Sequence, residues 1–176
     1  MSPAPRAGGR AQHTAAAVDA VRRIFRALRN AAQQTQTQSG ISAAQLFVLS
    51  SLADGAASSL TELGERTHTD RSSVGDVVDR LAEAGLVERY RSARDRRRTE
   101  VRITPAGRSL LRSAPRPPTA LLIAGLEAME EDALAALAAG LSRLTREMGL
   151  EAAPAPMLFE DEAGRLPEGG GREHDG

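Results

Sequence analysis

Apolar residues at helical spacing mark the first element of the chain. From Thr14 on they fall three or four positions apart, with arginines on the other faces, and this pattern predicts an amphipathic helix that runs to about Gln34. The Gln/Thr/Ser stretch after it and Gly40 are expected to end the helix. Residues 1–13 are rich in Pro, Gly and Arg without periodicity, so we expect a flexible arm there. The apolar stripe of the helix consists of Val18, Val21, Phe25 and Leu28.

Capping signals mark the starts of two further helices. Ser42 is followed three positions later by Gln45, and Ser59 by Glu62, each ahead of a leucine-containing stretch. A hydroxyl at the cap and a Glu or Gln three residues on can satisfy each other's backbone N–H groups, which favours a helix start. We therefore expect short helices to begin after each of these serines.

A fourth helix is expected over residues 71–84, with Asp70 as its N-cap and Gly85 just after its end. Only the connection 67–70 separates it from the preceding helix. Two helices joined by so short a turn must pack at a steep angle, which is the geometry of a helix-turn-helix.

Beyond this helix the spacing of apolar residues changes from that of a helix to every second residue, as in a strand. Residues 86–91 have β-propensity, residues 99–104 alternate apolar and polar positions, and the polar stretch 92–98 lies between them. This predicts a β-hairpin with a long basic tip. A helix, a helix-turn-helix and a hairpin in that order make a winged helix, here over about residues 42–104. We expect a mainly α protein with a small β-hairpin.

The C-terminal region, residues 105–149, is predicted to be helical, with a kink or a break at the prolines between 115 and 118. It contains a second apolar stripe at heptad spacing. A winged helix needs neither stripe for its own core, so we expect the two stripes to bury each other across the interface of a homodimer. An intrachain helical hairpin is the alternative. The second stripe consists of Leu134, Leu137, Leu141, Leu144 and Met148.

Charge is distributed unevenly along a chain that carries 23 basic and 23 acidic residues. Residues 66–116 hold thirteen arginines against seven acids, whereas residues 150–176 hold two arginines against seven acids. A basic segment that coincides with a winged helix favours a nucleic-acid partner. The acidic tail, residues 151–176, is expected to be mostly disordered, with one apolar patch at 157–159 that is able to dock.

Two groups of residues are candidates for contact with double-stranded DNA. The start of a second helix in a helix-turn-helix enters the major groove, where Arg can donate two bonds to guanine. Arginines crowded on a hairpin tip repel one another unless phosphates neutralise them. The candidates on the helix are Arg71, Ser72, Ser73, Asp76 and Arg80, and those on the tip are Arg94, Arg96 and Arg97.

The residues from Asp95 to Gly107, DRRRTEVRITPAG, resemble the wing signature of the MarR (multiple antibiotic resistance) family of bacterial transcription regulators. Matching segments precede it at the expected distance, and the resemblance extends over about residues 14–150. It implies a homodimer with interlocked terminal helices, at about 14–38 and 105–149, and two winged lobes on a palindromic operator. It also implies that Asp95 orients Arg97 in the minor groove, and that a small aromatic or phenolic effector releases DNA from a pocket whose residues the sequence does not name.

Other chemistries find little support in the sequence. The chain has no Cys, which excludes disulfides, thiolate metal sites and cysteine nucleophiles, and its three His show no ligand spacing. We found no nucleophile elbow, phosphate loop or paired acid and base, so we expect neither an enzyme nor a cofactor. No segment is apolar enough to span a membrane, and we expect a cytoplasmic protein. The sequence thus predicts a sequence-specific regulator, most often a repressor. The alternatives are a winged-helix protein-interaction module and a nonspecific nucleic-acid-binding module.

Overall fold

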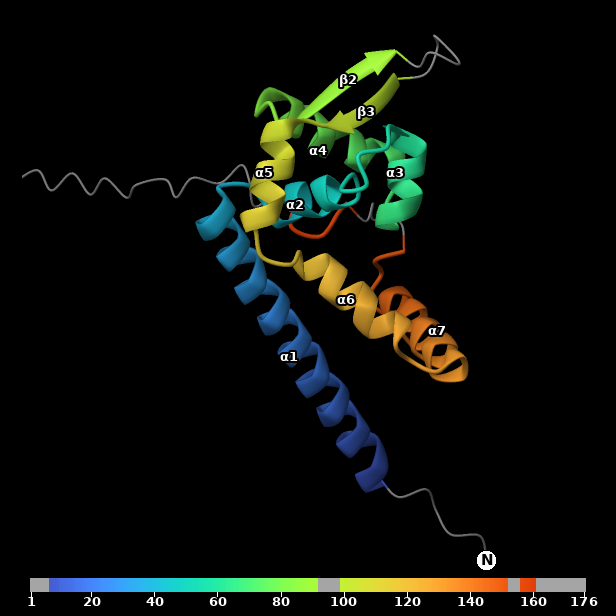
Figure 1. The fold of residues 1–176 in the computed structure, drawn as a ribbon. Helices are drawn as coiled ribbons and strands as arrows, with labels where there is room; N and C mark the ends of the chain where they lie inside the picture. Colours follow the sequence, from blue (N-terminus) through green and yellow to red (C-terminus); the bar gives the residue numbers. More distant parts are fainter. Residues whose placement is uncertain (1–6, 92–98, 152–155, 161–176) are drawn as a thin grey trace, which may run out of the picture.

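The computed structural model describes residues 7–91, 99–151 and 156–160, and within these ranges the chain forms seven helices and one small sheet (Figure 1). A lobe containing α2 to α5 and the sheet lies at one end, and α1, α6 and α7 extend away from it. The helices are α1 (Ala7–Ser39), α2 (Ala43–Ser50), α3 (Leu60–Thr67), α4 (Arg71–Glu83), α5 (Pro105–Ser113), α6 (Pro118–Glu127) and α7 (Glu131–Glu147). The strands are β1 (Ser58–Ser59), β2 (Val87–Arg91) and β3 (Thr99–Ile103).

The lobe is a winged helix, as the sequence predicts. Its core consists mainly of leucines and valines from α2, α3, α4, the sheet and their connections, and most of them have no accessible surface. Each such side chain contributes about 1.5–3 kcal/mol when it leaves water, so this cluster is what holds the helix-turn-helix against the sheet. The other members of the core are Ile41, Ala44, Phe47, Ile103 and Met157. The largest fully buried members are Leu46, Leu49, Leu52, Leu63, Leu81 and Ile103.

Both predicted capping boxes form. The Ser42 hydroxyl accepts the Gln45 N–H at 3.2 Å, and the Gln45 side chain accepts the Ser42 N–H at 2.9 Å. Ser59 and Glu62 make the same reciprocal pair at 3.2 and 2.7 Å. These short helices therefore begin where the local sequence places them.

The sheet contains a strand that the sequence pattern did not predict. β2 and β3 form the expected antiparallel hairpin, with Val87 opposite Ile103 and Arg91 opposite Thr99. β1 pairs with the other edge of β3, so the order is β1-β3-β2. A strand of two serines carries no alternation of apolar and polar positions, and only the approach of β3 gives its backbone a partner.

The first helix is longer than predicted at its N-terminal end. α1 begins at Ala7, so the expectation of a flexible arm over 1–13 is wrong for residues 7–13. The predicted end near Gln34 is also wrong, because α1 runs through the Gln/Thr/Ser stretch to Ser39. There the hydroxyls of Thr35, Thr37 and Ser39 donate to the carbonyl four residues back. Because these hydroxyls bond within the helix, they do not compete with it. Gly40, with φ of +73°, follows the end of α1.

The prolines of the C-terminal region break the helix rather than kink it. Pro115 disfavours the α-helical conformation at the residue before it, and Ala114 is extended, with φ of −77° and ψ of 151°. Helix α5 therefore ends at Ser113, and α6 starts separately at Pro118. This break redirects the chain from the lobe onto α1, against which α6 packs.

The apolar stripes of α1 and α7 stay largely uncovered in the single chain. Phe25 is 60% exposed, Met148 is 62% exposed, and no residue of α7 is buried. The alternative of an intrachain hairpin between the two stripes is therefore wrong, because such a hairpin would bury them. Residues of these stripes that remain exposed are Val18, Val21, Phe25, Leu137, Leu141, Leu144 and Met148, and Leu28 and Leu134 are half-buried.

Candidate nucleic-acid interface

The turn between α3 and α4 is built by close backbone packing. His68 ends α3 in the left-handed conformation, with φ of 52°, and the Thr69 N–H donates to the Gly64 carbonyl at 2.9 Å. A Cβ on Gly64 would lie 2.8 Å from the Thr69 carbonyl oxygen, so a side chain at this position would force the turn apart. The absence of a side chain at Gly64 lets α4 start directly against α3.

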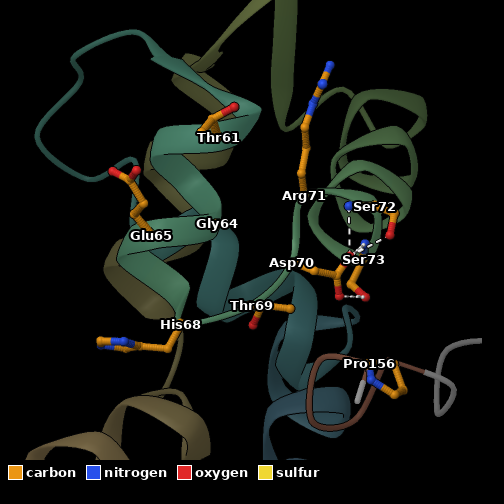
Figure 2. Close-up of a pocket in the computed structure, with 10 residues that line it drawn as sticks. All are labelled: Thr61, Gly64, Glu65, His68, Thr69, Asp70, Arg71, Ser72, Ser73 and Pro156. Atoms are coloured by element: carbon orange, nitrogen blue, oxygen red, sulfur yellow. Dashed lines mark hydrogen bonds between the residues drawn. The ribbon is translucent and has the colours of Figure 1, made fainter. Parts of the chain in front are cut away.

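Asp70 organises the first turn of α4, as the sequence predicts. Its carboxylate accepts the N–H groups of Ser72 and Ser73 at 2.9 and 3.0 Å and both of their hydroxyls (Figure 2). These hydrogen bonds, led by that from the Ser72 hydroxyl, hold the pKa of Asp70 well below its usual range. The carboxylate therefore stays ionised at the helix N-terminus, where the helix dipole also favours a negative charge.

The exposed residues at the start of α4 line open hollows toward the sheet. Arg71, Ser72 and Asp76 are exposed, and in Figure 2 the Arg71 side chain points away from the Asp70 cluster. A hollow of about 460 Å³ lies between α3, α4 and the sheet, and Arg71, Arg89 and Thr99 are among the residues that line it. A guanidinium at the edge of such an opening can reach a base edge or a phosphate.

The structure changes the prediction for one serine. Ser73 is only 9% exposed, and its hydroxyl donates to Asp70 at 2.8 Å. A buried hydroxyl already bonded within the turn is poorly placed to reach a base, so the DNA contact of Ser73 stays a prediction that this geometry does not favour. The polar type of the residue is explained by the cap instead.

Arg80 lies further along α4, and the structure places it against the C-terminal part of the chain. Its guanidinium donates to the Glu160 carbonyl at 2.9 Å and lies 3.5 Å from a Glu160 carboxylate oxygen. Arg80 is half-buried, with 34% of its side chain exposed. Sequence reasoning missed this pair because no local spacing connects residues 80 positions apart.

The wing, defined as β2, β3 and the residues 92–98 between them, is tied to α4 by Arg89. Its guanidinium pairs with the Asp79 carboxylate and donates to the Gly75 carbonyl at 3.3 Å. This pairing was not predicted from the sequence. The only signal for it there is that Arg89 and Asp79 carry opposite charges. The predicted wing residues Arg94, Asp95, Arg96 and Arg97 lie outside the described residues.

Metal binding and membrane insertion find no support in the part of the chain that the structure describes. It holds no group of three or more His, Asp or Glu side chains that could bind a metal ion. None of its helices combines the length and the hydropathy needed to cross a membrane.

Comparisons with known proteins agree with this geometry. Residues 39–98 match the model of the MarR family. The HTH-type transcriptional repressor MdtR of Bacillus subtilis (strain 168) is 30% identical over 84 residues, which are 48% of this chain and 54% of MdtR, so the chain spans about half the length of this curated relative.

Two solved structures share the fold. A MarR family transcription regulator superposes with a TM-score of 0.53 at 21% identity, covering 82% of this chain and 98% of its own. The transcriptional regulator BldR of Sulfolobus solfataricus superposes with a TM-score of 0.51 at 24% identity, covering 77% of this chain and 96% of its own. Their similarity extends beyond the winged lobe.

Proposed function

We propose that this chain, which belongs to the MarR family through the winged helix at residues 39–98, is a DNA-binding transcriptional regulator. The observation that carries the proposal is the start of α4, where Asp70 anchors the first turn, Ser72 is exposed, and Arg71 is exposed at the edge of an open hollow. An N-capped helix with an exposed guanidinium at its first position is suited to enter a major groove.

In this proposal two parts of the lobe contact DNA in different ways. Arg71 on α4 reaches base edges in the major groove, and the exposed Ser72 hydroxyl, which donates to Asp70, accepts a hydrogen bond from a base or lies against a phosphate. Asp76 lies on the same exposed surface. The wing arginines follow the backbone and the minor groove, where negative potential is strongest. These wing residues are Arg94, Arg96 and Arg97, with Asp95 orienting Arg97.

The protein acts as a homodimer on a palindromic operator. The uncovered stripes of α1 and α7 support this assembly, because apolar faces at both ends of a chain are stabilised when a second copy covers them. Two-fold symmetry then sets two lobes on half-sites about one helical turn apart, or a multiple of it.

Repression released by a small molecule is the proposed mode of regulation. The similarity to MdtR, whose name describes a transcriptional repressor, supports repression. The resemblance of the wing to the MarR signature supports an effector, which would be a small aromatic or phenolic compound. Its pocket is not assigned to residues.

Selection of a random duplex library on the purified protein tests the proposal. The winning sequence is then titrated against a scrambled duplex at a stated salt concentration. We expect an inverted repeat that binds at least about a thousandfold more tightly than the scrambled duplex. Uniform binding of every sequence would support the nonspecific alternative, and no binding at all would support the protein-interaction alternative.

The variant Arg97→Ala tests the wing in the same titration. We expect weaker binding to all duplexes and a salt dependence reduced by about one unit, because one phosphate contact is lost. Unchanged affinity would remove the wing from the proposed interface.

A further inference from the structure

Residues 156–160 form a docked segment on the flank of α4. Met157 is 3% exposed and belongs to the hydrophobic core cluster of the lobe, whereas its neighbour Leu158 is 43% exposed. Pro156 borders the hollow at the α3–α4 turn, together with Asp70 and Ser73 (Figure 2). The segment therefore begins near the first turn of α4 and is anchored by one buried side chain.

Hydrogen bonds close the segment on itself. The Met157 N–H donates to the Glu160 carboxylate at 3.1 Å, and the Glu160 N–H donates to the Met157 carbonyl at 3.1 Å. Between them Phe159 adopts φ of +66°, in the left-handed region that residues with a side chain rarely occupy. A conformation that costs free energy persists only where its surroundings impose it, so the contacts with the lobe define this turn.

The turn delivers Glu160 to Arg80. Glu160 is only 8% exposed, and its carbonyl and carboxylate oxygens face the Arg80 guanidinium at 2.9 and 3.5 Å. A carboxylate this far from solvent needs a positive partner, and Arg80 supplies it. Glu160 thus neutralises the positive charge of Arg80 on the helix that is proposed to enter the major groove.

The chain continues from this point with acidic residues. Residues 161–176 contain five acids and two arginines, and they follow directly after Glu160. Their attachment point is fixed on the flank of α4 by Met157 and Glu160. DNA phosphates brought to the same helix would find Arg80 already paired with Glu160.

We propose that the docked segment, residues 156–160, is an intramolecular brake on DNA binding that competes with DNA phosphates for Arg80. The inference rests on the proposed function. In the docked state Arg80 is neutralised by Glu160, and in the DNA-bound state it is neutralised by phosphate. The two states compete because the Glu160 carboxylate and a DNA phosphate would each neutralise the single positive charge of Arg80.

The test compares the unmodified chain, residues 1–176, with two variants of the same net charge. Met157→Gln removes the buried anchor, and Leu158→Gln makes the same type of change at the exposed neighbouring position. We expect Met157→Gln to bind the selected duplex about three- to tenfold more tightly, with a salt slope steeper by about one phosphate contact. Leu158→Gln should bind as the unmodified protein does. The midpoint of thermal unfolding, measured for both, shows that the lobe remains folded.

A third variant keeps the anchor and removes only the competing charge. Glu160→Gln should also tighten binding, and the gain should disappear when it is combined with Arg80→Ala, because the brake acts through that guanidinium. A gain that persists in the Arg80→Ala background would overturn the assignment of Arg80 as its target.

The outcomes separate the brake from the proposed function. If the unmodified protein binds its duplex and both Met157→Gln and Glu160→Gln bind with the same affinity, the docked segment is only a structural part of the lobe and the brake is refuted. A gain in Leu158→Gln equal to that in Met157→Gln also refutes it, because that change leaves the anchor in place. If no variant binds any duplex, the proposed function fails and the brake fails with it.

Discussion

Replacement of Phe25 by Ala should dissociate the proposed homodimer. Phe25 lies in the middle of the α1 stripe and is 60% exposed in the single chain. A phenylalanine side chain offers roughly 200 Å² of surface, so about 120 Å² is available for burial by a partner. At about 25 cal/mol per Å² this corresponds to about 3 kcal/mol per chain.

Two-fold symmetry doubles the contribution, because each chain of the dimer provides one Phe25. Alanine retains part of the buried surface, and the residual interface can relax, so we take about half of the doubled value, about 3 kcal/mol. Since 1.4 kcal/mol is a tenfold change, the dissociation constant of the dimer should rise roughly a hundredfold.

Sedimentation equilibrium over a range of protein concentrations measures this constant directly. Arg26→Ala is the matched control, because it truncates an exposed side chain of the same helix outside the apolar stripe. It should leave the constant within about twofold, as is usual for surface changes. An unmodified protein that stays monomeric at all concentrations, or a Phe25→Ala variant with an unchanged constant, would refute the reasoning.

Three further predictions concern the winged lobe. Arg71→Ala should relax base preference at one operator position by about 1–3 kcal/mol, and an unchanged selected motif would contradict the proposed base contact. Gly107→Ala should lower the free energy of unfolding by about 3 kcal/mol or more, because the new Cβ would lie 2.2 Å from the Leu86 carbonyl oxygen. In the matched change Gly75→Ala the new Cβ would have nothing within 4 Å, so this change should raise the free energy of unfolding by up to about 1 kcal/mol. Denaturant titration measures the free energy of unfolding of both variants, and equal effects would contradict the argument. Because the pKa of Asp70 is lowered on folding, its charge stabilises the protein above its ordinary pKa near 4, and this contribution is lost as the pH falls toward the lower folded value. The difference in melting temperature between the native protein and Asp70→Asn should therefore shrink below about pH 4, and a difference that grows on acidification would contradict the cap assignment.

Local patterns in the sequence were sufficient to predict most of the helices and strands of the winged lobe. Ser42 with Gln45 and Asp70 with its following serines predicted helix starts that the structure confirms, because the bonds that cap a helix join residues two or three positions apart. The change of period at residue 86 likewise predicted the hairpin. The prolines between 115 and 118 were predicted to interrupt the helix, and the structure shows that the interruption is a break with Ala114 in an extended conformation.

The fate of each candidate side chain was decided by tertiary contacts. Ser73 and Ser72 are adjacent residues of the same type, yet one is buried and the other exposed, because only one faces the lobe. The pairs Arg89 with Asp79 and Arg80 with Glu160 join elements whose approach no local spacing encodes.

By itself the sequence determined the order of elements, the winged-helix class, the basic centre and the two apolar stripes. These follow from periodicity, capping and charge, which act over a few neighbouring residues. Only the tertiary structure decided which polar residues face solvent, that the stripes remain uncovered within one chain, and that Met157 anchors Glu160 against Arg80. Burial and ion pairing depend on distances between segments far apart in the chain, and those distances exist only once the core around Leu49 and Val77 has formed.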